Sequence, residues 1–400
     1  MRTYKAQPLD LMQYINTKYH EPFIHEKIVF KNSIDINHLK DAIDKLIDVF
    51  PILKCTYHFE DNTFLENEIS ADDLVVISKG RDDDIILLTE SLDLKKQFIK
   101  FTICDKTLYI TISHLVTDGS GFKTLLYALC DIYNGKEENY DFLMKRDIAL
   151  LFKDVKKPSM IKMLASVLKS YKNRPVYEKK DIESLYIVER ILDAKVMKEV
   201  HRLAKENKAT LNDVFMTAYA IAIKRLCKED KINIPCNVDL RKYTRELMGS
   251  ANLTGTLNLN IKIKKDMDFM SCLKETSRLM NKQKKSLNDI AGPMLLVKKY
   301  KKTSLEKFLK TYGSLNTSPF VDYTNLGIID EKRLHFNDLE IINAISYSSV
   351  QKAPYFQIAI SSFKGATTFS SIFLCGKEEK KKIDLLLDCV VEEIIQFINE

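Results

Sequence analysis

The sequence of 400 residues contains no tryptophan, and its eight cysteines include no C-x-x-C pair. Without closely spaced cysteines, the chain offers no pattern for a zinc site or a redox disulfide. It also lacks any run near the ~18–20 apolar residues that a membrane-spanning helix needs. No apolar signal-peptide core follows Met1. These absences predict a cytoplasmic protein whose thiols are reduced and buried.

Several cofactor and catalytic motifs are missing as well. There is no P-loop and no G-x-G-x-x-G, so ATP and dinucleotide cofactors have no support. No H-E-x-x-H and no dense cluster of histidine and aspartate indicates a metal site. The run Gly119-Ser120-Gly121 does not form the G-x-S-x-G elbow of serine hydrolases. We therefore predict no metal, no permanently bound cofactor and no covalent nucleophile.

The composition is that of an ordinary soluble globular protein, with 45% hydrophobic and 29% charged residues. The net charge of +7 comes mainly from lysines scattered along the chain. Nucleic-acid binders more often show a concentrated basic stripe interleaved with aromatic residues, so we predict no nucleic-acid partner. Anionic small molecules remain compatible with this charge. A chain of this length is expected to form two domains, although one large domain is possible.

Hydrophobic periodicity divides the chain into two halves joined by a charged, proline-punctuated stretch. Both halves contain a hairpin followed by a helix, at 98–134 and at 355–398. The predicted organisation is an N-terminal domain at 1–155, a crossover linker at 156–184 with a short helix at 161–171, and a C-terminal domain at 185–400.

The predicted strands are 26–30, 52–57, 73–77, 98–103, 107–114, 185–191, 232–241, 258–263, 356–362 and 367–373. The predicted helices are 39–47, 122–133, 194–207, 211–226, 268–285, 293–310 and 378–398.

The most specific pattern is H-x-x-x-D-G, formed by His114, Asp118 and Gly119 at the end of a predicted strand. A histidine held there can act as a general base near neutral pH. A lone histidine on an apolar face is more often a core residue, but the following Asp-Gly corner favours a functional one. Gly119 permits backbone angles that other residues avoid, and so is expected to aim the imidazole.

Asp118 invites a catalytic pairing with His114, but physical arguments oppose it. The carboxylate follows a sharp turn and need not face the imidazole. A buried carboxylate needs a cation or several hydrogen-bond donors. Arg241, at the end of a predicted strand, is the best candidate partner by type and position; the alternative is that it is a surface arginine.

The motif resembles that of the chloramphenicol acetyltransferase-like superfamily. This group includes plant BAHD acyltransferases, condensation domains of peptide synthetases, wax-ester synthases and alcohol acetyltransferases. Residues 39–53 look like the family's first helix and the strand after it. Residues 237–241 look like its D-L-R corner, and residues 322–327 are similar to its S-N-x-G segment. Together these stretches cover nearly the whole chain in the expected order.

Two departures narrow the resemblance. Condensation domains usually carry a second histidine where this chain has Ser113, and the BAHD segment D-F-G-W-G is absent. Both favour a smaller stand-alone branch that resembles alcohol acetyltransferases.

The resemblance implies an α/β (α+β) two-layer sandwich: two chloramphenicol acetyltransferase-like domains with a tunnel at their interface. It implies transfer of an acyl group from acyl-CoA, as co-substrate, to a hydroxyl acceptor, with His114 as general base. Asp118 and Arg241 would hold the corner. Asn325 and Ser113 are candidates for binding the oxyanion or the substrate, although Asn325 is equally an ordinary turn residue. Two alternatives stay open, namely transfer from an acyl-carrier protein to an amine and a non-catalytic member of the fold.

Overall fold

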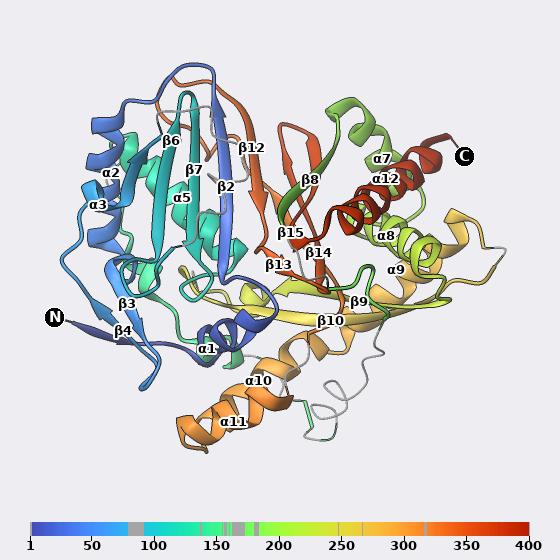
Figure 1. Cartoon of the computed structure of the whole chain (residues 1–400), viewed down its shortest axis with the longest axis horizontal. Coiled ribbons are helices and arrows are strands. Elements are labelled where there is room, and N and C mark those ends of the chain that lie inside the picture. The colour runs from blue at the N-terminus through green and yellow to red at the C-terminus, as the bar shows by residue number, and fades with distance from the viewer. Residues whose placement is uncertain are drawn as a thin grey trace.

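A computed structural model describes residues 2–78, 92–136, 138–153, 155, 158–159, 161, 173–179, 184–246, 248–265, 267–315 and 318–399. Two mixed sheets with helices stand side by side, the first half of the chain on the left of Figure 1 and most of the second half on the right. The predicted α/β sandwich architecture is confirmed.

The sheet of the first half has five strands in the order β12-β2-β7-β6-β5. Helices α2 and α5 lie against one of its faces (Figure 1). Alternate residues of β7, Leu108, Ile110 and Ile112, point into the core between sheet and helices, as their period of two requires. The bounds are β2 Phe23–Phe30, β5 Val75–Ile77, β6 Ile99–Cys104, β7 Thr107–Ser113, β12 Ile341–Tyr347, α2 Ile36–Val49 and α5 Gly119–Tyr133.

The second sheet follows the order β10-β9-β11-β14-β15-β13, and β8 also pairs with β15. Helices α7, α8, α9 and α12 pack over it around a separate core. The strands are β8 Ser184–Leu192, β9 Lys231–Asp239, β10 Thr254–Lys262, β11 Val321–Ile328, β13 Gln351–Lys352, β14 Phe356–Phe363 and β15 Ala366–Cys375. The helices are α7 Ala194–Glu206, α8 Leu211–Cys227, α9 Phe269–Lys285 and α12 Lys377–Asn399.

The remaining described elements are a small three-stranded sheet, four α-helices and five 3₁₀ helices. The sheet has the order β1-β4-β3, with β1 Thr3–Lys5, β3 Cys55–His58 and β4 Thr63–Glu66. The helices are α1 Pro8–Ile15, α3 Ala71–Leu74, α10 Asn288–Tyr300 and α11 Leu305–Leu315. The 3₁₀ helices are η1 Asn16–Lys18, η2 Pro51–Lys54, η3 Asp141–Met144, η4 Ile148–Phe152 and η5 Leu240–Tyr243.

Most predicted elements are present, and three are wrong in part. The strand predicted at 52–57 begins instead as η2, because Pro51 occupies the first helical position and only residues from Cys55 onward extend. The strand predicted at 73–77 starts as α3, where Ser70 and Asp73 form a capping box. The helix predicted at 293–310 is two helices, since Ser304 caps α11 by accepting the N–H of Lys307 at 3.3 Å.

The first sheet contains a strand from the second half of the sequence. β12 pairs antiparallel with β2 and was not predicted. The helices α10 and α11 likewise leave the second half and contact α1. The predicted domain boundary at 156–184 stays a prediction. β12, α10 and α11 follow this boundary in the sequence but pack against elements that precede it. Within the short helix predicted at 161–171, residues 162–171 lie outside the described part of the chain.

No helix among the described residues is long and apolar enough to cross a membrane. All eight cysteines are free thiols, six of them buried and two half-buried. The prediction of largely buried thiols is confirmed.

Candidate active site

His114 lies in the turn directly after β7, between the two sheets. Its backbone N–H donates to the carbonyl of Pro22 at 2.7 Å, which fixes the turn against the start of β2. The side chain is half-buried. The row of β7 residues that precedes it is therefore core, whereas the imidazole itself stays partly open.

Ser113 is fully buried, in contrast to its neighbour. Its hydroxyl oxygen accepts the N–H of Leu115 at 3.2 Å, and its backbone N–H donates to the carbonyl of Phe98. These contacts stabilise the turn that carries His114. They give no support to the substrate-binding role predicted for Ser113.

Asn252, from the segment before β10, contacts the imidazole across the junction of the halves. Its Oδ1 lies 3.0 Å from Nδ1 of His114. Its Nδ2 donates to the carbonyl of His114 at 2.7 Å, to the carbonyl of Leu115 at 3.3 Å and to Oδ1 of Asp10 at 2.8 Å. The amide is only 3% exposed, so these contacts hold it in one position.

A buried ion pair lies behind Asn252. Nη2 of Arg146 donates to Oδ2 of Asp10 at 2.9 Å, and the two side chains are 6% and 0% exposed. The second terminal nitrogen, Nη1, donates to the carbonyls of Val116 and Ser250. Neither Asp10 nor Asn252 was predicted, because no local pattern marks them.

Asp118 turns away from the imidazole and caps α5. Its Oδ1 accepts the N–H of Gly121 at 2.8 Å, and its Oδ2 accepts the N–H of Leu253 at 2.8 Å and the hydroxyl of Thr254 at 3.0 Å. Burial by itself raises the pKa of this carboxyl. The charge of Arg241 and these hydrogen bonds outweigh burial and hold the pKa below its usual value.

The predicted contact between Asp118 and Arg241 is present. Nη1 donates to Oδ2 at 3.1 Å, and Nη2 lies 3.1 Å from Oδ1. Arg241 also bonds Oδ1 of Asp239 at 3.0 Å and the carbonyl of Ala251 at 3.0 Å. The arginine therefore ties α5 to the segment that carries Asn252, and the surface alternative is wrong.

Gly119 of the motif and the nearby Gly121 lie in close contacts and do not adopt unusual backbone angles. Gly119 is the first residue of α5 and is not among the residues with positive φ. A Cβ there would lie 2.7 Å from Cδ2 of Leu326 on β11. At Gly121 it would collide with Oγ1 of Thr117 and lie 3.0 Å from Nη2 of Arg241 and 3.1 Å from the backbone nitrogen of Ala251. The angle argument for Gly119 is thus corrected: small residues let α5 meet the second sheet.

Asn325 lies on β11, and its side chain is engaged within the second half. Nδ2 donates to Oδ1 of Asn212 at 3.1 Å, and Oδ1 accepts the N–H of Gly327 at 2.9 Å. The oxyanion role of Asn325 stays a prediction. The neighbouring Leu326 reaches Gly119, so this strand does border the motif.

Burial dominates the electrostatics of the imidazole. It lowers the pKa of His114 below the usual 6.5, against the raising effects of the Asp118 charge, Asn252 and nearby backbone carbonyls. His20 lies close enough for its charge to interact with that of His114, and burial lowers the pKa of His20 to about 4. Both rings are therefore neutral at pH 7. His20 carries no sequence signal.

Glu26 on β2 is a buried carboxyl beside the junction. It is 1% exposed, and burial raises its pKa to about 7, although Ser346 and the charge of Lys123 oppose the rise. Lys123 bridges the halves by donating to the carbonyl of Leu326 at 2.6 Å.

Replacing Glu26 by glutamine is expected to stabilise the protein at pH 8 relative to pH 5. The folded-state pKa lies above the usual 4.5, so the protonated carboxyl stabilises the fold below pH 4.5, and that stability is lost as pH rises through about 7. Between pH 5 and pH 8, the difference in unfolding free energy between Glu26→Gln and wild type should grow by about 2–3 kcal/mol. Urea unfolding at both pH values measures it, with exposed Glu60→Gln as control. An equal effect of Glu26→Gln at both pH values contradicts this account.

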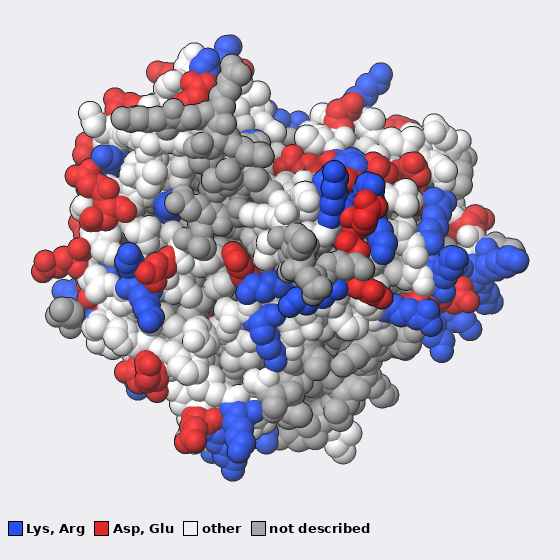
Figure 2. All heavy atoms as spheres, viewed as in Figure 1, with Lys and Arg blue, Asp and Glu red and all other residues white. Residues whose placement is uncertain are grey.

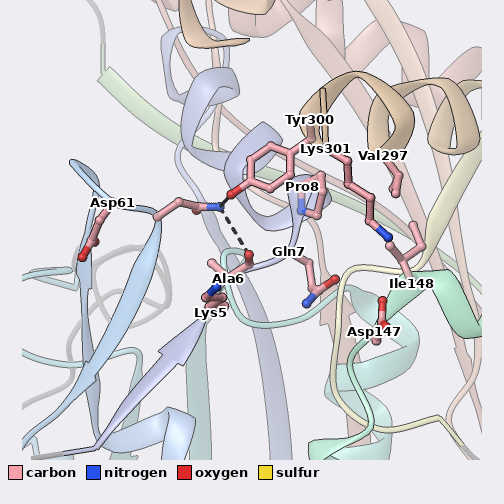
Figure 3. Close-up of a pocket in the computed structure, with 11 residues that line it drawn as sticks. Lys5, Ala6, Gln7, Pro8, Asp61, Asp147, Ile148, Val297, Tyr300 and Lys301 are labelled. Carbon is pink, nitrogen blue, oxygen red and sulfur yellow. Dashed lines mark hydrogen bonds between the residues drawn. The ribbon is translucent and has the colours of Figure 1, made fainter. Parts of the chain in front are cut away.

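A cavity of about 340 Å³ lies between the start of the chain and α10. Figure 3 shows Tyr300 pointing toward Ala6. Nδ2 of the buried Asn62 lies between them and donates to the carbonyl of Ala6 at 3.3 Å and to the hydroxyl of Tyr300 at 2.8 Å. None of the predicted site residues lines it. Across the described ranges, no group of three or more His, Cys, Asp or Glu side chains is placed to hold a metal ion.

The surface in Figure 2 mixes both signs of charge, with a denser group of lysine and arginine at the right-hand edge. Among the described residues on this face, lysine and arginine form no continuous stripe of the kind that nucleic-acid binders carry.

Comparison with known proteins places this fold. A family model described as "Condensation domain" matches residues 160–303. Over 257 residues the chain is 23% identical to bacitracin synthase 3 of Bacillus licheniformis. That match covers 59% of this chain and only 4% of the curated relative.

Solved structures match almost the whole chain. The trichothecene 15-O-acetyltransferase of Fusarium sporotrichioides is 15% identical with a TM-score of 0.72, covering 99% of this chain and 94% of that one. The EpoB NRPS cyclization-docking bidomain of Sorangium cellulosum is 10% identical with a TM-score of 0.71, covering 100% and 85%. The condensation domain of the Monacolin K polyketide synthase scores 0.69 at 11% identity, covering 100% and 98%. The predicted resemblance is confirmed at the level of the fold.

Proposed function

We propose that this chain, which has the fold of the chloramphenicol acetyltransferase-like superfamily, is an acyltransferase that moves an acyl group from a thioester to a hydroxyl acceptor. The observation that carries the proposal is a neutral, half-buried His114 held at the junction of the two halves. Everything that bonds its turn and its ring is built into the fold, so the imidazole is in place before substrate arrives.

The chemistry follows from a neutral imidazole. One ring nitrogen takes the proton of the acceptor hydroxyl while the oxygen attacks the thioester carbonyl carbon. The tetrahedral intermediate collapses, the C–S bond breaks, and the imidazolium returns the proton to the departing thiolate. General base catalysis of this kind contributes about 10²–10⁴-fold in rate. In this scheme Asp118 and Arg241 hold the corner and transfer no proton.

Acyl-CoA is the proposed donor and an alcohol the proposed acceptor. Two observations support this choice: Ser113 stands where condensation domains usually carry a second histidine, and a 15-O-acetyltransferase shares the fold along nearly its whole length. The donor and the acceptor would reach His114 through the tunnel predicted between the halves.

A second candidate is transfer from an acyl-carrier protein to an amine. The match of residues 160–303 to the condensation-domain model and the similarity to bacitracin synthase 3 favour it. In this case the same imidazole would take a proton from the amine, and the product would be an amide.

One screen separates the candidates. Purified protein is incubated with acyl-CoAs of increasing chain length, or with acylated carrier protein, and with alcohols or amines. Thiol release and product mass are followed, with His114→Ala as control. Turnover with CoA thioesters and alcohols supports the first proposal, and turnover confined to carrier-bound acyl groups and amines supports the second. Absence of turnover in every arm favours a non-catalytic member of the fold.

The acid limb of the pH–rate profile provides a further prediction. Because burial lowers the pKa of His114 below 6.5, the neutral base persists at more acidic pH than for a free histidine. The rate kcat/KM should therefore fall only at pH values below 6.5, with a slope of one proton. His20, whose pKa is about 4, and the ionised Asp118 are the titratable neighbours. A limb centred at or above pH 6.5 contradicts the assignment.

A further inference from the structure

The hydrogen-bond network around His114 determines which ring nitrogen carries the proton. A histidine general base works only if the nitrogen that faces the acceptor has a free lone pair, so the tautomer is a requirement of the reaction. This inference rests on the proposed function for its consequence in catalysis, but not for the tautomer itself.

The orientation of the Asn252 amide follows from its partners. Its Nδ2 is surrounded by the carbonyls of His114 and Leu115 and by a carboxylate oxygen of Asp10. All three atoms are acceptors, so only the NH₂ group fits among them. The amide oxygen must therefore face His114.

The tautomer follows from that orientation. Oδ1 of Asn252 lies 3.0 Å from Nδ1 of His114, and an amide oxygen can only accept. Nδ1 must then carry the hydrogen. The neutral ring keeps its lone pair on Nε2, which is the nitrogen left to take a proton from a substrate.

The ion pair of Asp10 and Arg146 fixes the amide in turn. The carboxylate of Asp10 accepts from Asn252 with one oxygen and from Arg146 and the N–H of Gln7 with the other. Bonds to a charged acceptor are the stronger kind, and here both charges are buried. Turning the amide over would set its oxygen against a carboxylate, which keeps the orientation unique.

We propose that Asn252, held by the Asp10–Arg146 pair, is a positioning residue that sets His114 as the Nδ1–H tautomer and so makes Nε2 the catalytic base. The four side chains come from α1, the segment after η3, the turn after β7 and the segment before β10. Both halves of the chain are needed to assemble them.

The tautomer can be read by nitrogen NMR on the full chain labelled with ¹⁵N-histidine, because protonated and unprotonated ring nitrogens differ widely in chemical shift. Seven histidines are present, and the spectrum of His114→Ala identifies the signals of this ring. At pH 8 the wild type should show Nδ1 protonated and Nε2 unprotonated. The opposite pattern in the wild type overturns the proposal, whether or not any variant folds.

Two variants extend the test. Asn252→Leu removes the side-chain acceptor and leaves only the backbone carbonyls of His114 and Thr117 near the ring. The ring should then shift toward a mixture of tautomers, and kcat should fall on the order of 10²-fold with KM little changed. Asn252→Asp keeps an acceptor for Nδ1–H, but its second oxygen would lie against the carboxylate of Asp10, so the new carboxyl should hold a proton at neutral pH. This variant should retain the tautomer and leave the acid limb of the pH–rate profile near its wild-type position. Exposed Asn260→Leu is the matched control. A folded Asn252→Leu with the wild-type spectrum and rate overturns the proposal.

The two proposals fail in different ways. If the wild-type spectrum shows Nδ1–H but no donor and acceptor pair reacts, the tautomer assignment stands and the proposed acyl transfer is wrong. If acyl transfer is found and depends on His114 while the spectrum shows Nε2–H, the function stands and the role of Asn252 is wrong.

Discussion

Replacing His114 by alanine is expected to lower kcat for acyl transfer by about 10²–10⁴-fold, the range that a positioned general base contributes. The substitution removes the only group in the proposed mechanism that moves a proton. The remaining rate would come from substrate positioning between the halves. KM should change little, because the imidazole acts on the reacting atoms and not on the distant parts of the donor.

The fold should survive this change, which makes the rate loss interpretable. The backbone N–H of His114 still reaches Pro22, and Asp118 and Arg241 keep their contacts. The main loss is a partner for Oδ1 of Asn252, worth about 1 kcal/mol. Melting curves of the variant should therefore stay close to the wild type.

A histidine elsewhere in the molecule supplies the control. His58 on β3 is exposed, so His58→Ala should leave both the rate and the melting curve unchanged. Thiol release measured for the three proteins under identical conditions decides the matter. If His114→Ala turns over at the wild-type rate, the general-base mechanism is wrong.

Elements with strong local periodicity were predicted from the sequence. The helix α8 shows why: its capping box of Thr210 and Asp213 and its apolar residues are all local signals. β12 was missed because a register shift between Ile341 and Asn343 interrupts its alternation, and Ile342 is 56% exposed. A strand whose pairing is irregular carries no clean period of two.

The residues of the candidate site likewise divide into those that a local pattern predicted and those that it could not predict. His114 and Asp118 form a compact motif, and the need of a buried carboxylate for a cation led to Arg241. Tertiary packing alone brings Asn252 to His114, from which it is 138 positions away in the sequence, and Asp10 to Asn252, from which it is 242 positions away. No spacing in the sequence encodes such contacts. The only trace of Asn252 is a polar residue within a run of small, buried neighbours.

The contacts of the H-x-x-x-D-G motif therefore form two separate sets. One arm of contacts, from Arg146 through Asp10 and Asn252, ends on the imidazole. The other, from Arg241 to Asp118, ends on the first turn of α5. Ala251 and Asn252 are adjacent in sequence, and Arg241 bonds the carbonyl of Ala251. The contacts of Arg241 thereby also hold the segment of Asn252, which orients the imidazole of His114.

Replacing Asp118 by asparagine should consequently affect folding first and rate second. The carboxylate is 3% exposed and paired with Arg241, and removing one partner of a buried pair costs about 3–5 kcal/mol. Asparagine has a single oxygen for acceptor bonds that now come from Arg241, Gly121, Leu253 and Thr254. Its NH₂ group would face donors, so the cap of α5 and the link to Leu253 cannot both survive.

The matched control is an exposed ion pair. Lys31 and Glu340 are 62% and 58% exposed, so Glu340→Gln should leave the free energy of unfolding nearly unchanged. Urea unfolding at pH 7 compares the two variants with the wild type. Arg241→Leu should match Asp118→Asn or exceed it, because it leaves a buried carboxylate without its cation.

The rate of Asp118→Asn separates a structural role from a catalytic one. Since Asp118 turns from the imidazole, the fraction of the variant that stays folded at low temperature should keep kcat within about tenfold of the wild type, far from the loss expected for His114→Ala. Wild-type melting combined with a His114-like loss of rate would show that the carboxylate acts on the reaction itself. Loss of stability with a retained rate in the folded fraction assigns Asp118 to the scaffold that holds the base.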